Sequence, residues 1–351
     1  MEIKNISINQ KIINNNKKPS LTGIIFTRAF CSVGIVIYHY FCHSKGTFKF
    51  LHNTANSSWG SMFVTSFFCI SGTVLYYNYP KIISIKTFYF KRWKSIFPSY
   101  YFCFLYFHSR NIFTFKKLFY RGHWSKLIFN ILGLDGYFFY RYKTYNLVGE
   151  WFLGSIIIIY ILYPILLWFV KKNLLFSQFL LCIGFIIMYK TDYFIINKWR
   201  NIITCINSFY FGMIFVKFRK IFFTNQKIFI FSFFVLILLC LYRIIPCVLI
   251  YQIQGFALYI VLVQFGQYIM CKKFSVIFGY ISSISYYIYL CHHRIILDVL
   301  SIYNPIEWYF HLVLLGLTIL LIIIYSKIVN IIINSIIKSK AFQKLELLIL
   351  N

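Results

Sequence analysis

The stretch FTRAFCSVGIVIYHYFCHS, residues 26–44, decides the fold class of this chain. It is a long apolar run typical of a membrane helix, yet it contains Arg28 and His39, which are costly to bury in hydrocarbon. Their spacing of eleven residues is three helical turns, so the two side chains lie within about 20° of the same helix face. Such residues either form a structural pair, with Arg28 reaching the inner interface and His39 bonded to a neighbouring group, or face a reaction path, which makes this helix a candidate for the functional core.

The composition extends the same argument to the whole chain. Of the 351 residues 60% are hydrophobic and 12% are charged, with a mean hydropathy of +0.72. A soluble core of this length cannot cover so much apolar surface, so we expect an all-α polytopic membrane protein with about ten transmembrane helices. The apolar runs are long and lack strand-type alternation, which argues against an outer-membrane barrel. The expected spans are 21–42, 61–80, 95–108, 151–170, 174–189, 201–217, 227–244, 247–270, 276–299 and 308–337.

The loops predict an orientation. Residues 1–20 are rich in Asn and Lys, and we expect them to form a disordered tail. We expect residues 21–337 to form the transmembrane domain and residues 338–351 to form a second tail. The longest loop, 109–150, lies on the side opposite the termini. Lys and Arg are more frequent in the short loops on the terminal side, so we expect N-in/C-in, with both tails in the cytoplasm and the chain in the inner or plasma membrane.

The strong positive charge has a topological explanation. The chain holds 36 Lys and Arg against 7 Asp and Glu, a net charge of +29. Because the basic residues fall mainly between apolar runs, orientation and lipid headgroups account for them, and we expect no nucleic-acid partner. The ten cysteines are scattered without a CxxC motif, which indicates buried thiols rather than disulfides or a metal site.

Two further stretches carry polar residues within or beside apolar runs. In SFFCISGTVLYY, residues 66–77, Ser71 and Gly72 provide either close helix packing or room for a narrow ligand. In FKRWKSIFPSYY, residues 90–101, the basic residues Lys91, Arg92 and Lys94 are either topogenic charges or a phosphate-binding cluster.

Two later stretches add candidate cavity residues. GEWFLGSIIIIYILYP, residues 149–164, begins with Glu150 and Trp151, and an acid at that position also complements the helix dipole. ISSISYYIYLCHHRIIL, residues 281–297, places Ser285, Tyr286 and His292 on an otherwise apolar helix. The adjacent pair of His292 and His293 lacks carboxylates at ligand spacing, so packing or hydrogen bonding is favoured and no metal is expected.

In this order the motifs resemble the membrane-bound acyltransferases of the acyltransferase 3 type, which include O-antigen and capsule O-acetyltransferases. The resemblance covers roughly residues 21–325. It rests on Arg-x10-His, a Phe-Phe-x-x-Ser-Gly helix, a basic cluster before an aromatic and Pro, a Trp-initiated helix with a later Tyr and Pro, and Ser-Tyr-x-x-Tyr-Leu-x-His. The corresponding residues are Arg28, His39, Phe67, Phe68, Ser71, Gly72, Arg92, Phe97, Pro98, Trp151, Tyr163, Pro164, Ser285, Tyr286, Tyr289, Leu290 and His292.

The resemblance implies transfer of an acyl group, most simply acetyl, from cytoplasmic acyl-CoA to a hydroxyl of an envelope polysaccharide or glycolipid. Acetyl-CoA would be a co-substrate, with no bound cofactor, and the partners would be the bilayer and the glycan acceptor. His39 would act as base or acyl carrier, and Arg28 would orient the donor or stabilise negative charge. Ser95 stands where the family has a second Arg, and Gly154–Ser155–Ile156 occupies the usual place of a Glu, so the role of Glu150 stays open.

Two other classes of protein fit part of the pattern. A transporter or flippase for a glycan precursor would also use intramembrane Arg and His, but the inverted repeats typical of that class are not visible in the sequence. A glycan polymerase would likewise have many spans and a large outer loop, but it needs no cytoplasmic thioester donor.

Overall fold

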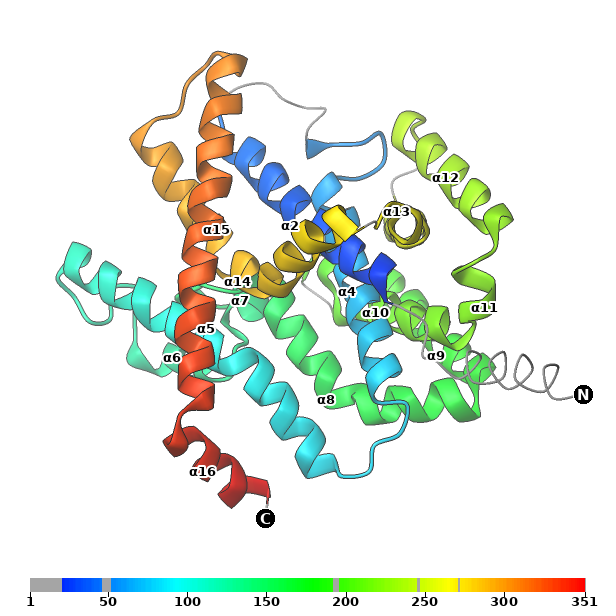
Figure 1. Cartoon of the computed structure of the whole chain (residues 1–351), viewed down its shortest axis with the longest axis horizontal. Helices are drawn as coiled ribbons and strands as arrows, with labels where there is room; N and C mark the ends of the chain where they lie inside the picture. Colours follow the sequence, from blue (N-terminus) through cyan, green and yellow to red (C-terminus); the bar gives the residue numbers. More distant parts are fainter. Residues whose placement is uncertain (1–20, 46–51, 192–195, 245–246, 271, 351) are drawn as a thin grey trace, which may run out of the picture.

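The apolar run with Arg28 and His39 forms helix α2, Thr22–His43, at the centre of the molecule (Figure 1). Helices α4 (Trp59–Asn78), α13 (Val248–Ile269) and α14 (Lys272–Ile302) pack around it. The computed structural model describes residues 21–45, 52–191, 196–244, 247–270 and 272–350. The predicted tail of residues 1–20 lies outside them.

The described residues form helices and no β-strand, which confirms the all-α prediction. The other long elements are α5 (Ile85–Phe115), α8 (Glu150–Lys172), α9 (Leu174–Lys190), α10 (Ile202–Lys217), α12 (Gln226–Leu241), α15 (Trp308–Lys338) and α16 (Lys340–Leu350). The short elements are η1 (Trp124–Lys126), α6 (Leu127–Ile131), α7 (Asp135–Phe138), η2 (Lys198–Arg200) and α11 (Arg219–Phe222).

Six of the described helices are long and apolar enough to cross a membrane: α2, α4, α8, α13, the part of α14 from Phe274, and α15. Helices α9, α10 and α12 are apolar but have only 17, 16 and 16 residues. Each of the ten predicted spans coincides with a helix, but the count of about ten membrane spans is not confirmed. The chain is a multi-pass membrane protein.

Helix α5 is much longer than the predicted span at 95–108. It begins at Ile85, where the Ser84 side chain accepts a hydrogen bond from the backbone of Thr87, and it continues past Pro98 to Phe115. Its last turns are polar, so hydropathy alone ends the span too early. They are held by an ion pair of 2.5 Å between Arg110 and Asp298 of α14.

Glycines let α4 and α10 approach closely. A Cβ atom on Gly72 would overlap the carbonyl oxygen of Phe209, and one on Gly212 would overlap the carbonyl oxygen of Cys69. Thr73 of α4 also donates a hydrogen bond of 2.9 Å to the carbonyl of Gly212. Small residues at such a crossing give the tight backbone packing that membrane helices use in place of a hydrophobic driving force.

The predicted outer loop, 109–150, is folded against α8 through α7. Its Asp135 is buried and accepts hydrogen bonds from Tyr100 (3.2 Å) and Asn130 (2.7 Å). Burial outweighs these bonds and raises the pKa of Asp135 to about 6. The stretch 127–139 of this loop contains the two short helices α6 and α7.

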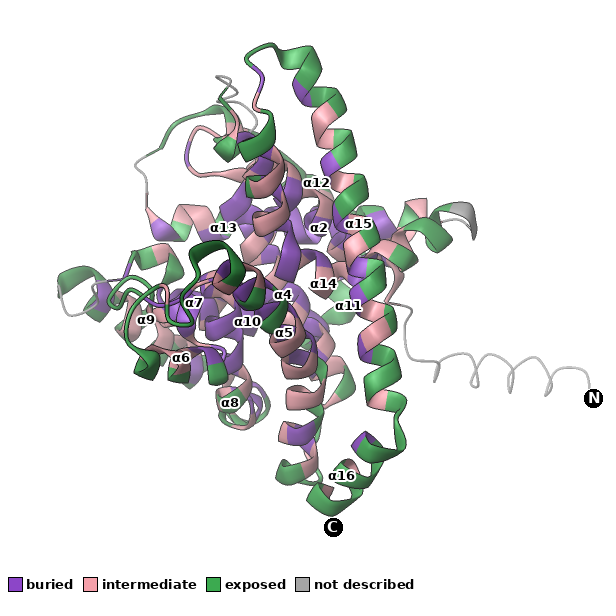
Figure 2. Cartoon of the chain, turned by 90° about the vertical axis from the view of Figure 1, so that its left-hand side faces the viewer, coloured by how far each residue is buried: buried purple, intermediate pink, exposed green. Residues whose placement is uncertain are grey.

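Large apolar side chains cover the outside of the molecule, as expected for a surface in contact with lipid. Figure 2 shows the buried residues gathered around α2 and α4, whereas α15 is largely exposed along its length. Beyond α15 the chain forms α16, where the second tail was expected. Phe342 of α16 stacks on Trp93, and Glu346 pairs with Lys94 at 2.5 Å, so α16 packs on the start of α5.

Candidate functional site

Arg28 lies on the wall of a cavity of about 320 Å³ that is shared by α2, α4, α5, α8 and α14. We call it the arginine cavity, because Arg92 of α5 also lines it. The buried Nε of Arg92 has no hydrogen-bond partner among the described residues, and its Nη2 donates to the Tyr79 hydroxyl at 3.2 Å. The site therefore offers two guanidinium groups, one with an unused donor, in a space large enough for part of a ligand. The lining residues are Arg28, Phe67, Ile70, Ser71, Val74, Leu75, Arg92, Ser95, Ile96, Phe152, Leu153, Ile156, Tyr160, Ser285, Tyr286 and Tyr289.

His39 lines a second, smaller cavity of about 80 Å³, the histidine cavity. Because Arg28 and His39 are eleven residues apart on one helix, the two side chains are separated by roughly 16 Å along the helix axis. The lining residues of the histidine cavity are Ile35, Tyr38, His39, Gly60, Val64, Phe67, Glu150, Trp151, Phe152, Trp199, Arg200, Tyr289 and His292.

Three aromatic residues belong to the walls of both cavities: Phe67 of α4, Phe152 of α8 and Tyr289 of α14. The rings of Phe67 and Phe152 have centroids 6.2 Å apart, and those of Phe152 and Tyr289 are 5.4 Å apart. The Tyr289 hydroxyl accepts a hydrogen bond of 3.0 Å from the backbone of Leu153 and donates to the carbonyl of Gly149. The two cavities are thus adjacent, with an aromatic partition between them.

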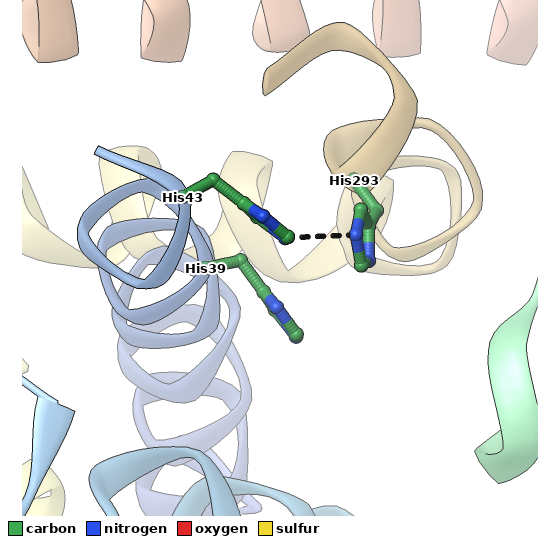
Figure 3. A group of neighbouring side chains, drawn as sticks. All are labelled: His39, His43 and His293. Atoms are coloured by element: carbon green, nitrogen blue, oxygen red, sulfur yellow. Dashed lines mark hydrogen bonds between the residues drawn. The ribbon is translucent and has the colours of Figure 1, made fainter. Parts of the chain in front are cut away.

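Four histidines gather beside Glu150. The ring centroid of His39 lies 5.2 Å from that of His292 and 4.9 Å from that of His293. His43, one turn beyond His39 on the same helix face, shares a hydrogen bond of 3.0 Å between its Nε2 and that of His293. Figure 3 shows the two imidazoles of α2 directed toward His293 of α14.

The backbone places Glu150 against this cluster. Gly149 has a φ of 83° and Glu150 itself has a φ of 34°, in the left-handed region that a non-glycine residue adopts only when its surroundings require it. A Cβ atom on Gly136 of α7 would overlap the backbone of Glu150, so α7 packs directly onto this turn. The carboxylate then accepts a hydrogen bond from Nδ1 of His293.

The tautomer of His292 follows from its neighbours. Its Nδ1 lies 3.1 Å from the carbonyl oxygen of Ile288 and 2.9 Å from that of Tyr289. Carbonyl oxygens only accept, so Nδ1 carries the proton and, in a neutral ring, Nε2 keeps its lone pair. That Nε2 is buried and has no hydrogen-bond partner among the described residues. A buried acceptor on a cavity wall is available to a substrate hydroxyl.

A third hollow, of about 470 Å³, adjoins the histidine cavity through Trp199 and is lined mainly by polar side chains. We call it the polar hollow. Its hydroxyl, amide, guanidinium and aromatic groups are those that commonly contact sugars. The residues are Asn53, Thr54, Ala55, Asn56, Ser57, Ser58, Ser61, Asn197, Trp199, Arg243 and Tyr251.

The residues predicted from the sequence separate into two places. Ser71, Arg92, Ser285 and Tyr286 line the arginine cavity with Arg28, and Glu150, Trp151 and His292 line the histidine cavity with His39. Three others line neither. Lys91 is exposed, Lys94 pairs with Glu346, and Gly72 packs against α10.

The sequence reasoning did not include His43, His293, Trp199 and Arg200 among the candidate residues. His43 could have been found, because it follows His39 by four residues and so shares its helix face. His293 and Glu150 are 143 residues apart, and no local spacing predicts that they meet. Trp199 and Arg200 lie in η2, a short element outside the apolar runs.

Comparison with known families decides between the classes of protein that this geometry allows. The chain matches the family model described as an acyltransferase domain over residues 21–327. It belongs to the acyltransferase 3 family. A search of curated proteins and a search of solved structures returned no match. The family assignment predicted from the motif order is therefore confirmed, and this membrane acyltransferase contains Arg28, His39, Glu150 and His292 within the matched region.

Proposed function

We propose that this acyltransferase transfers an acetyl group from acetyl-CoA to a hydroxyl of an envelope polysaccharide or glycolipid. One observation carries the proposal. The arginine cavity, the histidine cavity and the polar hollow follow one another: the first two share three wall residues, and the last two share Trp199. A donor subsite, a reaction centre and an acceptor subsite need this order when donor and acceptor come from opposite sides of a membrane.

The arginine cavity suits the donor. Coenzyme A carries phosphate groups, and guanidinium groups bind phosphate through paired, charge-assisted hydrogen bonds. Arg92 has a buried Nε free for such a bond among the described residues, and Arg28 lies on the same wall. The thioester arm then extends toward the aromatic partition, and the acyl group passes Phe67, Phe152 and Tyr289 to reach His39.

The histidine cavity supplies the chemistry. The acceptor hydroxyl gives its proton to His39 and attacks the thioester carbonyl, a C–O bond forms, the C–S bond breaks, and the proton passes to the leaving thiolate. In the variant with His39 as acyl carrier, the imidazole attacks first and the hydroxyl then takes the acyl group. Arg200, on the wall of this cavity, would supply a cation to stabilise the developing oxyanion.

The polar hollow suits the acceptor. Sugar hydroxyls pair with amides and hydroxyls, and an aromatic side chain such as Trp199 contacts the apolar face of a sugar ring. Because Trp199 also lines the histidine cavity, a sugar held there would present a hydroxyl close to His39. We place this side outside the cell, the arginine cavity toward the cytoplasm, and the protein in the inner or plasma membrane, as the charge of the loops favours.

The proposal is tested with His39→Ala in purified, folded protein supplied with acetyl-CoA and the isolated envelope glycan. Removing the base lowers the transfer rate by about 100-fold or more. His123→Ala is the matched control, because His123 is exposed in the predicted outer loop and lies outside both cavities. Undiminished transfer by His39→Ala would exclude His39 from the reaction, and no transfer by the wild-type protein would point to another donor or acceptor.

A further inference from the structure

Three imidazoles from two helices converge where α2 meets α14. One nitrogen from each of His39, His43 and His293 lies within 4.8 Å of the others. The ring centroids of His43 and His293 are 4.9 Å apart, as are those of His39 and His293. Three nitrogens this close need only small side-chain rotations to reach the roughly 2 Å that separates zinc from imidazole nitrogen.

Glu150 prepares His293 for such a role. Its carboxylate accepts a hydrogen bond from Nδ1 of His293, and Nε2 of the same ring lies on the side of His43. A carboxylate bound to the far nitrogen of a histidine fixes the ring and raises its basicity, as in the carboxylate–histidine–zinc arrangement. The contact between Glu150 and His293 could not be predicted from the sequence, because the two residues come from different helices.

The cluster of His39, His43 and His293 also leaves room for a water molecule as the fourth ligand of a bound ion. His43 is exposed, whereas His39 is mostly covered, so the cluster lies at the edge of the cavity where a hydrated ion can enter. Three protein ligands and a water complete the tetrahedral set that zinc prefers at sites that are not purely structural. A second combination, His39 with Glu150 and His292, would need the carboxylate that already binds His293.

We propose that His39, His43 and His293 bind a divalent transition-metal ion of the zinc class, with Glu150 as the outer carboxylate. Imidazole ligands select zinc, copper or nickel over magnesium and calcium, which prefer oxygen. A bound ion takes the lone pair of His39, so occupancy blocks acyl transfer. The binding itself does not depend on the proposed function, but the inhibition rests on it.

Binding is tested on the full-length protein, purified in detergent with a tag that contains no histidine and stripped with a chelator. Incubation with zinc chloride, removal of free metal and elemental analysis give about one zinc per chain for the wild type. His43→Ala and His293→Ala each weaken zinc binding by about tenfold or more, because even the loss of an orienting partner outside the ligand set costs at least that much. Cobalt in place of zinc gives visible absorption bands of nitrogen ligation in the wild type, and both cluster variants lose these bands.

His123→Ala is the matched control and retains the zinc, while magnesium chloride is not retained by any form. Because His43 is exposed, its truncation leaves the buried packing intact, and an unchanged melting temperature without zinc checks this. Zinc content unaffected by both cluster variants would overturn the proposal, as would absence of bound zinc in the wild type.

The inhibition has a separate readout. For each form, transfer with added zinc is divided by transfer with chelator, which cancels any change in basal rate. The ratio falls well below one for the wild type and His123→Ala and returns toward one for His43→Ala. Stoichiometric zinc with an unchanged ratio would refute the inhibition while leaving the site, and failure to detect any transfer would count against the proposed function but not against the binding result.

Discussion

The state of His292 is set by two carbonyl groups of its own helix. Since the carbonyls of Ile288 and Tyr289 both face Nδ1, the ring holds its proton there and keeps Nε2 open toward the reaction centre. The described contacts of the His39 ring are with the rings of Tyr38, His43, His292 and His293, so no carbonyl group among them fixes its tautomer. His292 is thus a second candidate for the group that receives the hydroxyl proton.

Replacing His292 separates its chemical role from a positioning role. His292→Ala lowers the transfer rate by about 100-fold, because a buried proton acceptor is lost. His292→Gln keeps an amide that can donate to the two carbonyls but cannot take up a proton at neutral pH, so it remains as slow as the alanine variant. Full rate in the glutamine variant, with steady-state kinetics as the measurement, would show that His292 only positions its neighbours.

Asp135 gives the folded protein a dependence on pH that is unrelated to the reaction. Its pKa is raised to about 6 by burial, against 3.8 for an ordinary Asp, so the folded chain keeps a proton that the unfolded chain has lost. The free energy of unfolding therefore falls as pH rises from about 4 to about 6, by up to about 3 kcal/mol, and is level above that range.

Asp135→Asn removes this dependence. The variant is expected to gain stability relative to the wild type as pH rises from 4 to 7, because its side chain stays neutral and still bonds to Tyr100. Thermal melting of both proteins in detergent at several pH values measures the difference. A constant difference in melting temperature across that range would contradict the raised pKa.

At the scale of elements, the crossing of α4 and α10 explains why a glycine stands at position 72. The sequence left two roles open for Ser71 and Gly72, and the structure gives them different surroundings. Ser71 lines the arginine cavity, whereas Gly72 meets the backbone of Phe209. The close crossing holds α4 in place, and α4 in turn carries Ser71 and Phe67 to the two cavities.

Gly72→Ala tests that crossing. The added methyl group has to displace backbone rather than a flexible side chain, so a loss of stability of about 1–3 kcal/mol or more is expected. Gly316→Ala in α15 is the matched control, because nothing lies within 4 Å of a Cβ atom there. The melting temperature should fall for Gly72→Ala and stay or rise for Gly316→Ala; equal behaviour would refute the packing argument.

The sequence predicted the positions of the helices better than their lengths. Hydropathy located a helix at each of the ten predicted spans, because apolar periodicity and composition are local properties. It failed for the C-terminal end of α5, which continues beyond the apolar run to Phe115 and there carries Arg110, paired with Asp298. The spacing of Arg28 and His39 placed both on one face, but the partition between their cavities depends on three helices meeting, which no local pattern encodes.

At the scale of the whole molecule, binding of the donor should stabilise the fold. A ligand that binds only the folded state adds about 2.7 kcal/mol to its stability at a concentration 100 times the dissociation constant. The arginine cavity joins five helices, so a ligand there links segments that are far apart along the chain.

Arg92→Ala is therefore expected to abolish most of the rise in melting temperature that acetyl-CoA produces. Lys91→Ala keeps it, because Lys91 is adjacent in sequence but exposed and outside the cavity. The measurement is a thermal shift titration with acetyl-CoA, with coenzyme A as a second ligand. An equal loss in both variants would indicate general attraction to a basic surface, and the absence of any shift in the wild type would count against acetyl-CoA as the donor.

The aromatic partition formed by Phe67, Phe152 and Tyr289 also bears on the proton permeability of the membrane. A path for a polar group through a bilayer can leak protons, because a continuous chain of water molecules conducts them. Such a leak would dissipate the proton gradient. The rings of Phe67 and Phe152 can turn aside by rotation about single bonds without displacing a helix, whereas Tyr289 is held by its hydrogen bonds to Leu153 and Gly149. If the acyl group passes between the two cavities as proposed, the same three residues would close that passage between turnovers and so limit the leak of protons across the membrane.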